Sequence, residues 1–132
     1  MLTYKSSCLW KVSSIFITLL LYGCEAEIKN GKQAFQRCTS CHSMKPGINF
    51  TGPSLAGILN RKAGTAIGFS YSPAVKSSGV VWTAENLDAW LTNPQAFIPG
   101  TKMKFEGIPN QKAREELIAI LRVKTALPSR EQ

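Results

Sequence analysis

The sequence predicts an all-α fold of four to five short helices joined by long loops. In several segments apolar residues recur at three- and four-residue spacing, and these segments begin at residues that can cap a helix. No stretch alternates apolar and polar residues as a β-strand would. At 132 residues the chain has room for one domain and a targeting segment.

The first helix is expected to begin after Asn30, a capping residue, and to place Phe35 and Cys38 on one face. The stretch from Met44 to Gly68 is predicted to be loop, because proline and glycine interrupt it repeatedly. Ser72-Pro73 then predicts the start of a short helix that ends at Ser78-Gly79. Such long loops need something inside them to pack on.

Three more helices are expected in the second half of the chain. One is capped by Thr83, ends before Pro94 and carries the apolar stripe Leu87, Trp90 and Leu91. Asn93-Pro94 begins a single turn of helix through Phe97, and Ile98–Phe105 is predicted to be loop. Asn110 caps the last helix, with apolar positions Ala113, Leu117, Ile120 and Leu121, and the tail Thr125–Gln132 is expected to fray.

The run Cys38-Thr39-Ser40-Cys41-His42 has the spacing of a c-type haem attachment site. Two thiols about one helical turn apart can each add to one vinyl group of a porphyrin, which leaves the next residue, His42, under the iron. His42 is the one histidine of the chain. One alternative is a zinc knuckle, but a closed zinc site needs four ligands, and the other cysteines, Cys8 and Cys24, lie in a leader that is expected to be removed. The other alternative is a thioredoxin-like pair, which needs a βαβ pattern nearby, and none is visible in the sequence.

The opposite face of the iron needs a second ligand. Met44 lies two residues after His42 and cannot reach round the ring, whereas Met103 lies in the distant loop Ile98–Phe105. A methionine in a loop is more often a packing residue, but a half-coordinated haem favours Met103 as the ligand. A thioether is a soft, neutral donor that raises the reduction potential and closes the iron to substrates. The pair His42 and Met103 therefore predicts an electron carrier.

Residues 1–26 are expected to form a secretory signal segment, because Lys5 and Lys11 precede the short apolar run Val12–Tyr22. Cleavage after Ala26 would release a domain of residues 27–132. A second possibility is cleavage before Cys24, in a sequence that resembles a lipobox and would leave a lipid on Cys24; Tyr22 fits that pattern poorly. An uncleaved membrane anchor is a third, less favoured reading.

Charge indicates the class of partner. The whole chain carries a net charge of +8, and loss of the leader removes two basic residues and one acidic residue, which leaves +7. Two haem propionates would lower this to about +5. For an exported haem protein, an acidic protein partner is expected rather than nucleic acid.

The segments that follow the haem motif resemble the class I cytochromes c of mitochondria and the bacterial periplasm. The resemblance runs from Asn30 to about Arg122 and is densest at Asn93-Pro94 and at Ile98-Pro99-Gly100-Thr101-Lys102-Met103-Lys104-Phe105. Further matching segments are Thr51-Gly52-Pro53, Arg61-Lys62, Gly68-Phe69-Ser70-Tyr71 and Trp82. It implies the cytochrome c fold, its helices wrapped around one covalently bound haem c.

The resemblance also implies roles for single residues. Pro53 would accept a hydrogen bond from the second nitrogen of His42. Tyr71 and Trp82 would donate to a haem propionate, with Arg61 near it, and Thr101 would bond near the other propionate. The pocket walls would be Leu55, Leu91, Phe105 and Leu121. Trp90 stands where mitochondrial members usually have a tyrosine that reaches the methionine sulfur, and Val75 replaces a common asparagine.

The predicted function is one-electron transfer between redox complexes, without catalysis, by a monomer exported to a bacterial periplasm. Partners with acidic docking surfaces are expected, such as a quinol-oxidising cytochrome bc complex, a terminal oxidase or a dehydrogenase. Four basic residues around the haem edge would steer these acidic partners toward it: Arg37, Lys45, Lys102 and Lys104. The alternative is a haem enzyme or gas sensor in which Met103 dissociates.

Overall fold

The computed structural model describes residues 28–126 and contains five helices in that range. They are α1 (Gly31–Thr39), α2 (Pro73–Ser77), α3 (Ala84–Thr92), α4 (Pro94–Phe97) and α5 (Gln111–Ala126). Between residues 28 and 126 there is no strand, and a single isolated bridge pairs Lys62 with Val81. The all-α prediction is confirmed.

The first four helices begin at the caps that the sequence predicted. The side chains of Asn30, Ser72, Thr83 and Asn93 each accept a hydrogen bond from a backbone N–H in the first turn of the helix that follows. Asn110 does the same before α5, where its Oδ1 accepts from Ala113 N at 3.1 Å. Because each cap satisfies an otherwise unpaired N–H, it fixes where its helix starts.

The last helix differs from the prediction at two points. It continues through Ala126, so the prediction that the chain frays from Thr125 placed the end of the helix two residues too early. The rest of the predicted tail, residues 127–132, lies outside the described range. The buried face of α5 includes Ile118 at 7% exposure, whereas Ile120 is only partly buried. Ile118 lies beside Leu117 and three residues before Leu121, so it faces the same core.

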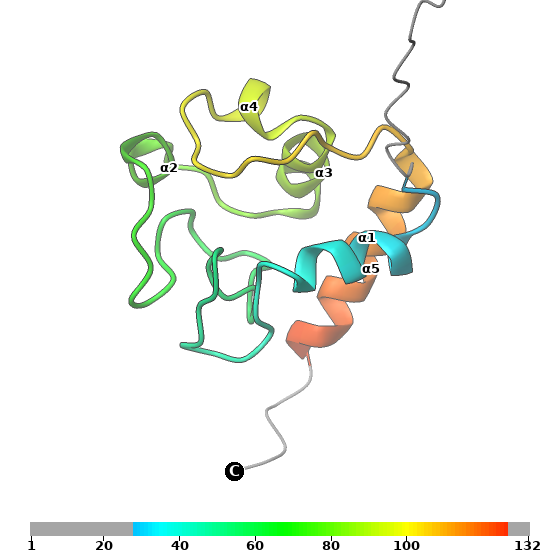
Figure 1. Ribbon diagram of the computed structural model, residues 1–132, viewed down its shortest axis with the longest axis horizontal. Helices are drawn as coiled ribbons and strands as arrows, with labels where there is room; N and C mark the ends of the chain where they lie inside the picture. Colours follow the sequence, from blue (N-terminus) through cyan, green and yellow to red (C-terminus); the bar gives the residue numbers. More distant parts are fainter. Residues whose placement is uncertain (1–27, 127–132) are drawn as a thin grey trace, which may run out of the picture.

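Helices α1 and α5 cross, which brings the first and last helices of the described chain into contact (Figure 1). Gly31 N donates to Glu116 Oε2 at 2.8 Å. A Cβ at Gly31 would run into the Glu116 Cβ and the backbone of Leu117, so the crossing needs a glycine here. Buried residues of both helices, Ala34 of α1 and Leu117 of α5, belong to the same apolar core.

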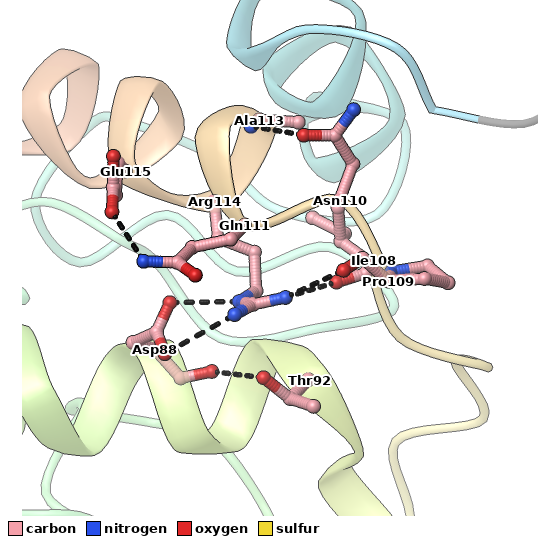
Figure 2. Close-up of polar contacts among 9 residues, drawn as sticks. All are labelled: Asp88, Thr92, Ile108, Pro109, Asn110, Gln111, Ala113, Arg114 and Glu115. Carbon is pink, nitrogen blue, oxygen red and sulfur yellow. Dashed lines mark hydrogen bonds and ion pairs between the residues drawn. The ribbon is translucent and has the colours of Figure 1, made fainter.

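A buried arginine links α3 to the start of α5 (Figure 2). Arg114, which is 8% exposed, donates from Nε to Asp88 Oδ1 at 2.7 Å. Its Nη1 donates to the carbonyl oxygens of Ile108 at 2.8 Å and Pro109 at 3.0 Å. These bonds fix the far end of the segment between α4 and α5, the segment that contains Met103. None of the helices within residues 28–126 is long and apolar enough to cross a membrane.

Candidate haem-binding site

The described chain surrounds a cavity of about 880 Å³. Its walls come from α1, α2, α3, α5 and the loops between them. Every residue predicted to contact the cofactor lines it: Cys38, Cys41, His42, Pro53, Arg61, Tyr71, Trp82, Trp90, Thr101 and Met103. The expected walls Leu55, Leu91, Phe105 and Leu121 line it as well. The fold therefore brings residues from distant parts of the sequence to one large, mostly apolar space.

His42 is positioned where α1 ends. Its backbone N–H donates to Cys38 O at 2.9 Å, which continues the helical turn and points both cysteines and the imidazole toward the cavity. Nδ1 lies 2.7 Å from the carbonyl oxygen of Pro53. A carbonyl can only accept, so Nδ1 carries the proton and the lone pair of Nε2 remains available for a metal. Burial lowers the pKa of His42, which favours this neutral form, although the bond to Pro53 acts in the opposite direction.

Neither cysteine of the motif forms a disulfide; Cys38 is partly buried and Cys41 is exposed. Burial, together with the nearby Cys41, raises the pKa of Cys38 to about 11. So high a pKa differs from that of the acidic thiol that a redox-active pair requires. Within residues 28–126 no group of three or more His, Cys, Asp or Glu side chains could hold a metal ion. Neither the thioredoxin-like nor the zinc interpretation finds support in the described chain.

Arg61 provides a test of whether the cavity fits a haem. Its terminal nitrogens donate to the carbonyl oxygens of Ala56 at 2.7 Å and Ser54 at 2.8 Å. Its Nε is buried with no hydrogen-bond partner, the one such side-chain atom in the described residues. Burial also lowers the pKa of Arg61. A buried donor without an acceptor is costly, and a carboxylate of a ligand in the cavity would satisfy it. The donor set therefore fits a group with buried anionic ends, such as the haem propionates.

Other donors line the same cavity. The hydroxyl of Tyr71 accepts from Ala66 N at 3.2 Å, so its own hydrogen is free to donate. Trp82 and Trp90 pack edge to face, with ring centroids 5.2 Å apart, and are 7% and 8% exposed. Neither indole N–H donates to another described residue. The cavity thus offers hydrogen-bond donors set in an aromatic wall.

Met103 lies on the segment between α4 and α5, which crosses the molecule on the opposite side from the loop after α1 (Figure 1). The turn that leads to it closes with Thr101 N donating to Ile98 O at 3.1 Å around Pro99-Gly100. Thr101 is buried, and its Oγ1 accepts from Met103 N at 3.3 Å. Met103 is partly buried and lines the cavity, whereas Met44 lines a separate, smaller pocket beside His42.

Gly52 lies in the matching segment Thr51-Gly52-Pro53, but the sequence analysis gave it no role of its own. It is buried against His42, and a Cβ built on it would run into the imidazole ring. The position therefore accepts no side chain while the ring holds its place. The available signal was that Gly52 directly precedes Pro53, whose carbonyl was expected to bond to the His42 ring. It could be interpreted only after His42 had been assigned to the cofactor.

Val75 is buried at 6% exposure and lines the cavity from α2. We expect Val75→Asn to lower the reduction potential by roughly 50 mV, because a buried amide would stabilise the ferric charge by about 1 kcal/mol, and a tenfold change in a one-electron equilibrium is about 59 mV. Potentiometric titration of the holoprotein measures this. Val75→Leu, which adds volume without polarity, is the control. A rise or no change in Val75→Asn would refute the argument.

No family model matches the chain. The chain is 47% identical over 92 residues to cytochrome c2 of Rhodoblastus acidophilus, which covers 69% of this chain and 86% of that protein. It is also 47% identical over 95 residues to cytochrome c type-1 of Ascaris suum, with 71% of this chain and 85% of that protein covered. Among solved structures, cytochrome cH from Methylobacterium extorquens matches with a TM-score of 0.67 and 39% identity, over 74% of this chain and 98% of that one.

Each of these relatives is matched over most of its own length, so the similarity is not confined to the haem motif. The chain belongs to the class I cytochromes c, electron carriers with one covalently bound haem c.

Proposed function

We propose that His42 and Met103 are the two axial ligands of the haem iron, and that Cys38 and Cys41 form its thioether bonds. The single observation that supports this most strongly is that one imidazole with a free Nε2 lone pair and one loop thioether line the same cavity. When bound, the haem supplies an iron that exchanges one electron. A neutral sulfur ligand favours the ferrous state and so a positive potential.

The protein holds its ligands and polar groups in place during electron transfer. The Pro53 carbonyl fixes the imidazole plane and makes His42 a better donor. Arg61, Tyr71 and Trp82 are proposed to hold one propionate, and Thr101 to act near the other. Because these groups are already held by the fold, little has to rearrange when the charge of the site changes.

The lining of the cavity supports a carrier over an enzyme or gas sensor. Apart from His42, the described residues that line it include no histidine, aspartate or glutamate. A haem enzyme that acts on peroxide, or a haem protein that senses gases, usually places an acid–base group beside the open face of the iron. We therefore propose that the chain transfers electrons without catalysing a reaction of its own.

A redox titration of the holoprotein with spectral detection tests this function. The account predicts one reversible one-electron wave at a positive potential. The absorption spectrum of the pyridine haemochrome should be that of a haem whose two vinyl groups are both saturated by thioether bonds. A negative potential, or a haem that acid acetone extracts, would contradict the proposal.

We propose that acidic surfaces of redox partners dock over a basic rim around the cavity mouth. Arg37, Lys102 and Lys104 are exposed and line the cavity, and no carboxylate of the described chain lies among its lining residues. Lys45 is exposed beside the smaller pocket next to His42. A cytochrome bc complex, a terminal oxidase or a dehydrogenase would each provide such a surface.

The bimolecular electron-transfer rate is expected to fall about tenfold between low salt and physiological ionic strength, because added ions screen this attraction. Stopped-flow mixing with an acidic redox protein measures the rate. Lys104→Gln should lower the low-salt rate. Lys112→Gln removes an exposed charge from α5, away from the cavity lining, and should leave the rate nearly unchanged. A flat salt response would argue against steering.

We also propose that residues 1–26 direct export to a bacterial periplasm, where thioether formation would follow. The basic residues and apolar run before Glu27 support this. The intact mass of the mature protein tests it. A chain that begins at Glu27 and carries one haem is expected, and a retained leader would contradict the proposal.

A further inference from the structure

Gln95 holds the backbone of the segment that contains Met103. It is the second residue of α4, it is exposed, and it does not line the cavity. Its Nε2 group lies 3.1 Å from Thr101 O and 3.2 Å from Met103 O. A primary amide has two N–H donors, so one side chain can serve both carbonyl oxygens at once.

Few other polar contacts hold this part of the chain. The turn before it is closed by the bond from Thr101 N to Ile98 O, and Met103 N donates to Thr101 Oγ1. The next backbone bond along the chain is from Ile108 N to Leu91 O at 2.8 Å. Among the described residues, therefore, the segment 102–107 is joined to the rest of the protein by hydrogen bonds at Met103 alone.

The bond from Gln95 to Met103 O is the one that connects this segment to a helix. The other bond at Met103 is made within the loop, to Thr101. The bond from Gln95 to Thr101 O holds the same loop two residues before Met103. If the loop swings away from the cavity, both Gln95 bonds must break, so together they favour the closed position of the methionine.

We propose that Gln95 is a positioning residue that keeps the sulfur of Met103 on the haem iron. This inference rests on the proposed ligation by Met103. The amide does not touch the haem or the iron; it acts through the two carbonyl oxygens. Without it, the sulfur leaves the iron more readily, and an external ligand that competes with the sulfur binds more tightly.

The test uses the ferric holoprotein titrated with cyanide. Loss of two hydrogen bonds should raise the apparent cyanide affinity of Gln95→Ala about tenfold. Gln95→Glu keeps the size of the side chain but sets an acceptor against two carbonyl oxygens, so at least the same increase is expected. In both variants the sulfur-to-iron absorption band should also disappear at lower pH than in the parent protein.

Asn86→Ala is the matched control. Asn86 also donates from a side-chain amide to a backbone carbonyl, Val81 O at 2.7 Å, but it lies at the start of α3 and does not line the cavity. Its loss should lower the thermal stability without changing cyanide affinity. If the parent shows the sulfur-to-iron band and both Gln95 variants bind cyanide as the parent does, the inference is wrong. If the parent lacks that band, the assignment of Met103 itself is wrong.

Discussion

Replacing Met103 by alanine is expected to lower the reduction potential by a few tenths of a volt, a large part of the roughly 0.8 V range that axial ligands span. The variant loses the one methionine sulfur among the described residues that line the cavity, the proposed sixth ligand. Water or hydroxide would take that position and stabilise the ferric state. Potentiometric titration gives the potential, and mixing the reduced variant with carbon monoxide shows the open position.

Met44→Ala is the control for this experiment. Met44 is partly buried and lies beside His42 in the smaller pocket, and it does not line the large cavity. Its replacement should cost some packing energy but leave the reduction potential within a few tens of millivolts of the parent value. If Met103→Ala kept the parent potential and remained closed to carbon monoxide, another group would have to be the sixth ligand.

Gly52→Ala is expected to have the largest effect on assembly of the holoprotein. The added Cβ would overlap the His42 ring, whose Nδ1 is already held 2.7 Å from Pro53 O. Either the ring must turn away from the cavity or the loop must shift and lose that bond. We expect a loss of roughly 2–4 kcal/mol in the free energy of unfolding and a weakened bond from His42 to the iron. Denaturant unfolding and the haem spectrum measure the two effects.

Gly57→Ala separates steric overlap from backbone strain. Gly57 has a positive φ of 63°, and nothing lies within 4 Å of a Cβ built there. Its replacement should cost about 1 kcal/mol through backbone strain and leave the haem spectrum unchanged. Equal stability losses in the two variants, with a normal spectrum for Gly52→Ala, would show that the contact with His42 is unimportant.

The helices could be predicted from the sequence because local chemistry determines where they begin. Asn30, Ser72, Thr83 and Asn93 each cap the helix that follows, and such a bond spans three residues. The end of α5 had a weaker signal, because Pro128 lies two residues after Ala126 and no glycine or proline comes earlier in the helix. The prediction placed the end at Thr125, before that signal.

Apart from the bond between His42 and Pro53, which the resemblance implied, the contacts that hold the site could not be predicted, because they join residues far apart or through backbone atoms. Arg114 reaches Asp88, 26 positions away, and two carbonyl groups whose orientation depends on the loop. Gln95 likewise bonds to carbonyl oxygens, which every residue type has. Residue identity alone does not indicate such partners. The large cavity follows from the assembled helices, whereas its polar contacts follow from details of the loops.

The central claim is that both axial positions of the iron are filled by protein side chains. Exposing the reduced parent holoprotein to carbon monoxide at neutral pH tests it most directly. The account predicts that the haem spectrum stays unchanged, because Met103 remains bound where the gas would have to bind. A prompt spectral shift would contradict it and would favour an iron that is open to ligands.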